Sequence, residues 1–468
     1  MSIWETNGGL YLGVGTGGTE TPRSGNPKYD QRNIIPYVDD RHAFLVGPNG
    51  SGKTRRLFLH NVACLTEWSY ICVDPKGVLA TMARNGVVKN MVVIDPFGVL
   101  PGTSAWLNPV ASLDPNSDEF EDDAMLMAEA LIRPGEKEPH WGESAQEIVA
   151  GLIMYSRFSK GRHGSLPDVR RLLSLPPTEM RKEAKLMGEI AEKYDCDAIT
   201  HKTAKLLEWT PENKELNSII STALTQTRWL DSKPIIRNLE EPEPDKSGAI
   251  QPPVDFSQLK DVATKIFLIL PPKRLRTHAT WLKLVITSIL QPLMMRTKVA
   301  KVPVLFMLDE YYAIAKGGFP VIEDNMAMLR EYGIKLWIAL QDLSQAHMLW
   351  GRDGFQSYVA NAGIFQAFGV HDVLTAKFVS DLSGEEFIPL TNTSKGTSLS
   401  PSGSPTINRG DSVNHIKVPI IWPEQVRNMD DGYSIIYSHK LKGPLFSYLP
   451  YPTLISHLAP FVAGDPSV

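Results

Sequence analysis

Cysteine is scarce in this chain of 468 residues, and its scarcity excludes two classes of protein. The 3 cysteines are Cys64, Cys72 and Cys196, an odd number with no paired spacing. Disulfide-stabilised secreted domains carry an even and dense set, and structural zinc sites bring their cysteines in close pairs. Neither pattern is present, so the cysteine usage fits a reducing compartment such as the cytosol.

Long apolar runs are also missing from the sequence. No stretch reaches the roughly 18 apolar residues that a membrane-spanning helix requires. The strongest candidate, residues 282–295, contains Lys283, Gln291 and Pro292, and we expect it to form a packed helix. The N-terminus lacks the basic start and apolar core of a secretory signal peptide.

The chain has no large excess of charge of one sign. Its formal net charge is −4, with 21% charged and 43% hydrophobic residues, as in ordinary globular proteins. This balance excludes an overall basic surface that coats nucleic acid, but it leaves room for a local basic groove or pore. The length predicts two or three domains rather than a single core.

The chain does contain a P-loop, GPNGSGKT at residues 47–54, which fits the pattern GxxxxGK[ST]. Its glycines let backbone N–H groups approach the phosphates of a nucleotide. Lys53 is expected to reach the β- and γ-phosphates, and the Thr54 hydroxyl to bind Mg²⁺. An apolar run precedes the loop and a helical pattern follows it, so the phosphates would face a helix N-terminus. We predict that ATP or GTP binds through Gly47, Pro48, Asn49, Gly50, Ser51, Gly52, Lys53 and Thr54.

Eight short apolar runs alternate with helical patterns along the chain. Near-continuous apolar strands separated by helices are typical of a parallel sheet covered on both faces. The predicted fold is therefore α/β, a three-layer P-loop domain with a mostly parallel sheet. The runs are residues 43–46, 70–73, 91–94, 266–270, 302–308, 334–340, 364–368 and 433–437.

One long stretch interrupts this alternation with helical periodicity, and its clearest apolar stripe lies at residues 145–155. We predict an inserted all-helical domain at residues 114–232, between two parts of the nucleotide-binding domain at 1–113 and 233–468. Residues 240–253 are rich in Pro and Glu and would form the return linker. Residues 391–412 are rich in Ser, Thr, Gly and Pro, which predicts a long mobile loop.

Hydrolysis requires groups beyond the P-loop, and two strand ends offer them. Asp309 and Glu310 follow the run at 302–308, and Gln341 follows the run at 334–340. Ligands of open α/β sheets bind at the carboxyl ends of strands, so these side chains are expected beside the P-loop. Asp309 would hold Mg²⁺, Glu310 would act as general base, and Gln341 would sense the γ-phosphate. The alternatives are helix-capping acids and a surface glutamine in a turn.

Two other strands end in turns of one kind, DPKG at residues 74–77 and DPFG at residues 95–98. Asp and Pro both favour such bends, and turn chemistry accounts for Asp95. For Asp74 and Lys76, a role in shaping the nucleotide cleft or its subunit neighbour stays open.

In their order along the chain, these motifs resemble the VirD4/TraG coupling proteins of type IV secretion. The first half carries GPNGSGKT, YICVDPKG, VVIDPFG, LNP and HWGESAQEIVAGLI. The second half carries FLILPPKRLRTHATWLKLVI, then LFMLDEYYAIAKGGFPVIEDNMAMLREYGIKLWIALQDLSQAHMLWG, then NAGIFQAFGVHDVLTAKFVSDLSG. The likeness covers nearly the whole chain, and LDE followed by a glycine-containing loop and YGIKLWIALQDLSQ is its most specific part.

The resemblance implies a RecA-like nucleotide-binding domain with an inserted all-alpha domain, and a ring, expected to be a hexamer, with ATP and Mg²⁺ at its subunit interfaces. Such a ring couples hydrolysis to delivery of DNA, relaxase–DNA complexes or effector proteins to secretion channel components. Lys53 and Thr54 would then be Walker A residues, Asp309 and Glu310 the Walker B pair, and Gln341 the sensor. The expected location is cytoplasmic, at the inner membrane.

The chain departs from the family pattern at several points. Family members usually begin with transmembrane helices, and none is visible here. The alternatives are an anchor outside this sequence, an anchor supplied by a membrane-anchored partner, or no anchor at all. Val78 replaces the usual acidic residue after DPKG. Ring ATPases also use an arginine from a neighbouring subunit, for which Arg274, Arg276 and Arg330 are candidates. Each could instead form a surface salt bridge.

Three hypotheses for function follow from the sequence. The first is a substrate-pumping ATPase. The second is a recruitment platform that binds ATP to assemble but contributes little motive force. Another FtsK/VirB4-like ring ATPase is a further alternative to the first. The third is a P-loop kinase for a small molecule, which would need an arginine-rich lid that the sequence does not show.

Overall fold

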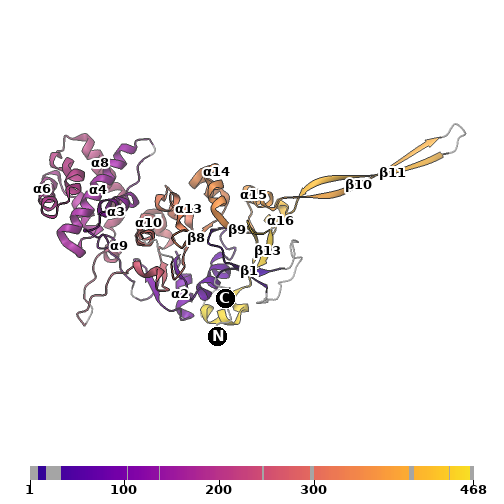
Figure 1. Cartoon of the computed structure of the whole chain (residues 1–468), viewed down its shortest axis with the longest axis horizontal. Helices are drawn as coiled ribbons and strands as arrows, with labels where there is room; N and C mark the ends of the chain where they lie inside the picture. The colour runs from indigo at the N-terminus through magenta and orange to yellow at the C-terminus, as the bar shows by residue number, and fades with distance from the viewer. Residues whose placement is uncertain are drawn as a thin grey trace.

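The computed structural model describes residues 9–16, 33–102, 104–135, 137–244, 247–295, 300–399, 405–441 and 443–463. In this part of the chain, eleven strands form one sheet in the middle of the molecule. A helical domain lies at one end of the sheet and a two-stranded hairpin projects from the other (Figure 1). Among the described residues, no helix combines the length and the apolar character needed to cross a bilayer.

Seven neighbouring strands, in the order β9-β3-β8-β7-β4-β6-β5, pair only in parallel. Beyond β9 the sheet continues through β12, β13, β1 and β2 with antiparallel pairings. The parallel strands are β3 (His42–Val46), β4 (Ser69–Val73), β5 (Met91–Ile94), β6 (Lys265–Leu268), β7 (Val304–Leu308), β8 (Ile334–Leu340) and β9 (Ala362–Phe368). The antiparallel extension comprises β1 (Leu10–Gly15), β2 (Ile34–Tyr37), β12 (Tyr433–Ser438) and β13 (Leu445–Tyr448).

The eight strands predicted from apolar runs are all present, with small shifts at their ends. The sequence does not predict β1, β2 and β13. Gly13 interrupts β1 and Pro36 interrupts β2, and both residue types weaken a strand signal. β13 is only four residues long.

The sheet is the middle of three layers, because side chains along each strand alternate between two cores. On β7, for example, Leu305 and Met307 join one core while Phe306 joins the other. The first core is closed by η2 (Lys53–Phe58), α1 (Leu59–Cys64), α2 (Val78–Asn85) and α17 (Ala459–Val462). The second is closed by α10 (Pro272–Met294), α11 (Tyr311–Ala315), α12 (Pro320–Glu323), α13 (Met326–Leu329), α14 (Leu343–Asn361), α15 (Val373–Ser383) and α16 (Pro423–Arg427). The predicted three-layer, mostly parallel α/β fold is confirmed.

Between β5 and β6, the described residues form helices and no strand, so the predicted all-helical insertion is confirmed. Its helices are α3 (Phe120–Leu131), α4 (Pro139–Lys160), α5 (Leu166–Leu173), α6 (Pro177–Tyr194), α7 (Asp197–Thr203), α8 (Lys214–Thr227) and α9 (Lys233–Leu239). The apolar stripe on α4 is buried, and Ile148 and Leu152 are representative of it. The domain boundaries at residues 114 and 232 stay a prediction; the run of helices continues through α9.

The prediction of a long loop at residues 391–412 is wrong for the described part of that segment. β10 (Glu385–Leu399) and β11 (Pro405–Pro419) pair antiparallel in one continuous register and project from the body (Figure 1). Residues 400–404, between these strands, lie outside the described residues. The sequence misleads because the strands carry Ser, Thr and Asn rather than an apolar run, so hydrogen bonding between their backbones defines them instead of burial.

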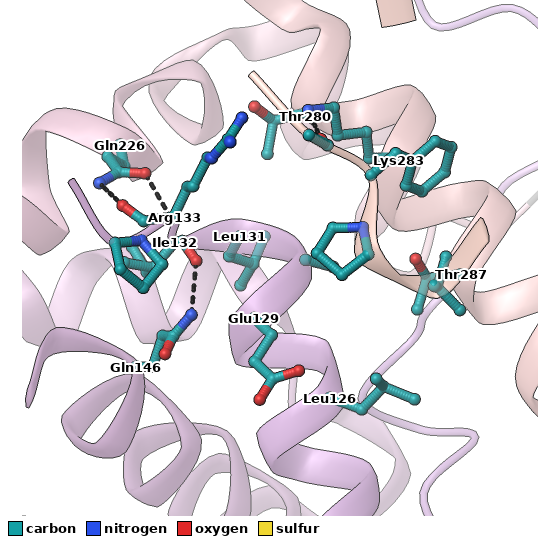
Figure 2. A pocket seen from close by; sticks show the side chains of 16 residues that line it. Leu126, Glu129, Leu131, Ile132, Arg133, Gln146, Gln226, Thr280, Lys283 and Thr287 are labelled. Atoms are coloured by element: carbon teal, nitrogen blue, oxygen red, sulfur yellow. Dashed lines mark hydrogen bonds between the residues drawn. The ribbon is translucent and has the colours of Figure 1, made fainter. Parts of the chain in front are cut away.

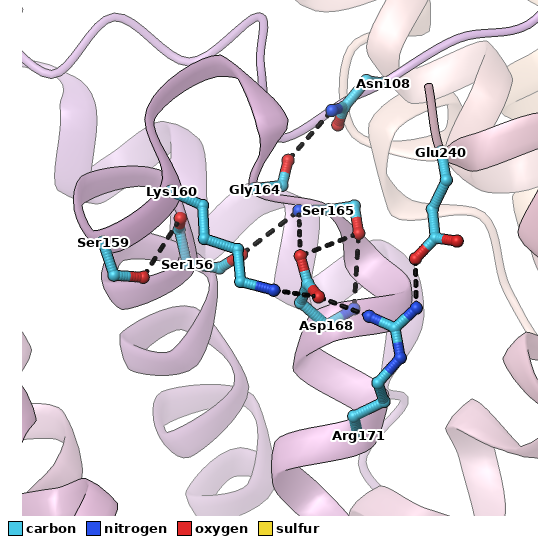
Figure 3. Close-up of polar contacts among 9 residues, drawn as sticks. All are labelled: Asn108, Ser156, Ser159, Lys160, Gly164, Ser165, Asp168, Arg171 and Glu240. Atoms are coloured by element: carbon cyan, nitrogen blue, oxygen red, sulfur yellow. Dashed lines mark hydrogen bonds and ion pairs between the residues drawn. The ribbon is translucent and has the colours of Figure 1, made fainter. Parts of the chain in front are cut away.

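A buried carboxylate fastens the base of the helical domain (Figure 3). Asp168, on α5, accepts from the Ser165 backbone N–H at 3.1 Å and pairs with the Lys160 ammonium at 2.6 Å. It also pairs with Arg171, which in turn contacts Glu240 on the segment that returns to the sheet. The incoming segment is held nearby, since the Asn108 amide donates to the Gly164 carbonyl at 2.9 Å. These contacts therefore hold both chain segments that connect the helical domain to the sheet.

Asp168→Ala is expected to lower the free energy of unfolding of the helical domain by about 2–4 kcal/mol, because it removes one half of the capping box of α5 and leaves two cations without their buried partner. The partners Lys160 and Arg171 are themselves more than half exposed, which keeps the loss at the lower end. Urea unfolding followed by circular dichroism measures the change. The control is Glu179→Ala in an exposed pair with Lys182, where a change within about 0.5 kcal/mol is expected. Equal effects of the two substitutions would contradict this role of Asp168.

Candidate nucleotide-binding site

The P-loop leaves the end of β3, as the sequence predicts, and leads into η2, a π-helical turn that continues as α1. The Gly47 N–H donates to the Leu340 carbonyl at 3.0 Å, which holds the start of the loop against β8. Gly50 and Gly52 have φ angles of 85° and 93°, in the left-handed region that disfavours side chains. A Cβ on Gly52 would also lie 2.7 Å from the Arg56 side chain. The glycines are therefore required by the backbone path.

Lys53 lies inside the loop, where its ammonium donates to the Gly47 carbonyl at 2.5 Å and to the Pro48 carbonyl at 3.0 Å. Burial lowers its pKa, while the nearby carboxylates of Asp309 and Glu310 oppose that shift. The charge of Lys53 therefore interacts with the charges of both acids. A triphosphate in the loop would replace the two carbonyls as the acceptor of the ammonium.

Thr54 and Asp309 meet across the site, with the Thr54 hydroxyl donating to Asp309 Oδ2 at 3.2 Å. Asp309 directly follows β7 and is 8% exposed, and burial raises its pKa although Lys53 opposes the shift. A hydroxyl and a carboxylate at this separation are hard oxygen ligands, which fit Mg²⁺. The predicted Mg²⁺ ligands are therefore neighbours in the structure.

Glu310 and Gln341 are joined side chain to side chain, since the Gln341 amide donates to Glu310 Oε2 at 2.9 Å. Glu310 has a φ of 55°, which is uncommon for a residue with a side chain and is often found at functional sites. Gln341 is fixed in turn, because its backbone N–H donates to Gln345 Oε1 at 3.0 Å. The general base and sensor proposed from the sequence thus form one hydrogen-bonded pair.

Sequence reasoning missed Gln345 and Arg56, which lie beside the loop. Gln345 stands three residues after Asp342, whose carboxylate caps α14, a spacing that resembles a capping box and could have identified it. Arg56 donates to the Leu449 carbonyl at 3.0 Å, and its guanidinium lies 5.2 Å from the centre of the Tyr451 ring. No local pattern predicts the contact between Arg56 and Leu449, because they are 393 residues apart in the sequence.

Asp74 ends β4 beside β7, next to the position of Asp309. Its carboxylate accepts from the backbone N–H groups of Val78 at 3.0 Å and Ala80 at 2.8 Å, which caps α2. Burial raises its pKa to about 7, and the charge of Asp309 adds to that shift. Lys76 is exposed. Asp74 therefore shapes the turn beside the site rather than offering a free carboxylate.

Asp95 behaves as a turn residue, because its carboxylate accepts from the Leu100 N–H at 2.8 Å within the same bend. The three arginines considered for action in a neighbouring subunit are all exposed. The Arg274 guanidinium lies 5.5 Å from the centre of the Phe97 ring in the second Asp-Pro turn. The other two candidates are Arg276 and Arg330.

A family model described as Type IV secretory system Conjugative DNA transfer matches residues 13–445. The chain belongs to this family. Conjugal transfer protein TraG from Rhizobium radiobacter is 24% identical over 412 residues, which cover 85% of this chain and 60% of TraG. The coupling protein VirD4 of the type IV secretion system of Bartonella henselae is 23% identical, over 77% of this chain and 56% of VirD4. The resemblance to VirD4/TraG proteins is confirmed, and the chain spans about three fifths of the length of these relatives.

Solved structures agree on the fold. The plasmid coupling protein TrwB in complex with ADP and Mg²⁺ has a TM-score of 0.64 at 13% identity, and the match covers 95% of each chain. At this identity the likeness supports the fold, a RecA-like domain with an all-helical insertion.

Proposed function

We propose that this chain is an ATP-driven coupling protein that recruits DNA, or DNA bound to protein, and translocates it to a type IV secretion channel. The domain arrangement would be a nucleotide-binding domain made of residues 1–113 and 233–468, with the all-alpha domain at 114–232 inserted. Family membership supports the coupling role. The geometry of the site supports the finer statement that ATP is hydrolysed.

The observation that carries the proposal is the convergence of five side chains at the carboxyl ends of three adjacent parallel strands. β3, β8 and β7 are neighbours in the sheet, and they lead into the P-loop, Gln341 and the acids, respectively. Two contacts close the set, from Thr54 to Asp309 and from Gln341 to Glu310. A phosphate-binding loop that only recruited nucleotide would not need the second contact.

The chemistry assigned to each residue follows from its position. Thr54 and Asp309 would hold Mg²⁺, which neutralises charge on the β- and γ-phosphates when bound. Lys53 would leave the loop carbonyls and donate to the phosphates. Glu310 would accept the proton of the attacking water, and Gln341 would hold the carboxylate in place. Gln341 lies one strand away from Glu310 and would also report the γ-phosphate.

We further propose a ring assembly at the cytoplasmic face of the inner membrane, together with secretion channel components and a membrane-anchored partner. Relatives named conjugal transfer protein and coupling protein support these partners. An exposed arginine such as Arg276 or Arg330 would then reach the γ-phosphate of the adjacent subunit. Contacts to DNA would involve phosphates rather than bases, because a motor must act on any sequence.

The decisive experiment measures ATP hydrolysis with and without DNA. Purified protein is expected to hydrolyse ATP slowly, and DNA to raise the rate several-fold, with the stimulation falling steeply between about 50 and 200 mM salt. Electron microscopy with nucleotide and DNA tests for rings. A rate that ignores DNA, together with ATP-dependent ring assembly, would instead identify a recruitment platform.

A further inference from the structure

A short turn connects the proposed general base to the helical domain. Glu310 immediately precedes α11, a helix of five residues, and the turn Lys316-Gly317-Gly318 follows its last residue. At about 1.5 Å per residue, α11 is only about 7–8 Å long. The Gly318 N–H donates to the Ala315 carbonyl at 2.7 Å, which ties the turn to the end of the helix. A shift of the turn therefore reaches Glu310 through one rigid element.

A lysine from α10 holds this turn on one side. The Lys283 ammonium donates to the Gly318 carbonyl at 2.5 Å and lies 3.4 Å from the Lys316 carbonyl. Lys283 is only half-buried, yet its ammonium is directed at the backbone and not at solvent. Both acceptors belong to the turn, so this side chain fixes the position of the turn relative to α10.

An arginine of the helical domain lies against the turn on the other side. Gly317 and Gly318 have φ angles of 88° and 92°, and a Cβ on Gly318 would lie 2.9 Å from the Arg133 guanidinium. The two glycines therefore permit both the bend and the approach of Arg133. The backbone of Arg133 is anchored to α8, because it exchanges two hydrogen bonds with the Gln226 amide, at 2.7 and 2.8 Å.

A cavity of about 140 Å³ lies beside this turn, between α10 and the end of α3 (Figure 2). In Figure 2, Lys283 and Thr287 project from α10, while Glu129 and Arg133 lie opposite them at the end of α3. Thr287 is 2% exposed, and its buried hydroxyl has no hydrogen-bond partner among the described residues. Close-packed interiors resist small shifts, whereas a cavity with an unpaired hydroxyl leaves room for side chains to rearrange.

We propose that the Lys316–Gly318 turn transmits movement of the helical domain to Glu310, and that Lys283 is a positioning residue for hydrolysis. Lys283 would act through α11 and would not touch the nucleotide. Arg133 would carry to the same turn a movement of the helical domain that we propose DNA binding causes. This inference rests on the proposed ATPase function.

The charge of Lys283 offers a readout that a purely structural role would not change. Burial, together with the positive charge of Arg133, lowers the pKa of Lys283 to about 8, while Glu323 of α12 opposes the shift. Glu129 lines the same cavity. The side chain is therefore protonated below pH 8 and loses its charge as the pH rises through that value, which weakens its bonds to the turn. An arginine at this position keeps its charge throughout.

The test compares Lys283→Met with Lys283→Arg, for which the adjoining cavity provides space. Lys283→Met is expected to lower kcat about 10- to 100-fold with KM for ATP within about twofold, because a misplaced group slows chemistry without weakening binding. Lys283→Arg should keep at least about a third of the rate and should hold it at pH 9, where the wild type declines. Lys273→Met, an exposed cation of the same helix, is the control and should change neither constant.

For Lys283→Met, two outcomes overturn the inference: an unchanged kcat, or an increase in KM alone. If Lys283→Met does not fold, as judged by its melting curve, Arg133→Ala decides. This variant is expected to reduce DNA stimulation about 5-fold or more and to leave the rate without DNA near that of the wild type. The control is Lys185→Ala, an exposed cation of α6, and full stimulation in Arg133→Ala would overturn the inference. A wild-type protein that binds ATP without hydrolysing it would instead refute the proposed function, and the inference with it.

Discussion

Glu310→Gln is expected to lower kcat for ATP hydrolysis by about 10²- to 10⁴-fold and to leave ATP binding within a few-fold of the wild type. The substitution removes the group that accepts the proton of the attacking water, but it conserves size and shape. A glutamine oxygen can still accept from the Gln341 amide, which now donates to Glu310 Oε2 at 2.9 Å. Glutamine and glutamate both have a Cβ, so the substitution does not change the backbone strain at this position, where φ is 55°.

Steady-state hydrolysis and equilibrium binding of a fluorescent ATP analogue with Mg²⁺ separate the two effects. The control is Glu331→Gln, which removes an exposed carboxylate at the turn before β8 and should leave both constants unchanged. Hydrolysis at the wild-type rate in Glu310→Gln would show that another group activates water. Loss of binding and hydrolysis together would place Glu310 in nucleotide binding rather than in catalysis.

The parts of this site that can be read from the sequence are those fixed by local rules. The P-loop is recognisable in the sequence because Gly50 and Gly52 must adopt left-handed φ angles, which few residue types tolerate. β7 and β8 are apparent because they are buried on both faces, which requires an apolar residue at nearly every position. Asp309 and Gln341 then follow from their place at strand ends.

The parts that cannot be read from the sequence depend on distant partners or on hydrogen bonding between backbones. The hairpin of β10 and β11 is rich in polar residues, so no apolar alternation marks it. Arg56 and Tyr451 are far apart in the sequence, and the folding of the antiparallel strands onto the sheet brings them together. Arg133 and Gly318 are likewise brought together by the docking of the helical domain, and the glycine pair in the sequence gives no hint of its partner.

Lys53→Met is expected to weaken ATP·Mg²⁺ binding by about 10²- to 10³-fold, because it removes charge-assisted hydrogen bonds to phosphate worth about 1.5–3 kcal/mol each. Hydrolysis falls with it. Without nucleotide, the same substitution should leave the melting temperature unchanged or slightly raised. The reason is that burial disfavours the ammonium, as its lowered pKa indicates, and methionine fills the space without a charge to desolvate.

A thermal melt with and without ATP·Mg²⁺ tests both halves of this expectation, since a ligand that binds only the folded state raises the melting temperature. Wild-type protein should show the ligand-induced increase and Lys53→Met should not. Lys89→Met, at an exposed position before β5, should behave as the wild type. If Lys53→Met melts much earlier than the wild type without nucleotide, the two bonds from Lys53 to the Gly47 and Pro48 carbonyls are a structural support of the loop. If it retains the full ligand-induced increase, the phosphates do not bind at Lys53, and the proposed ATPase site is wrong.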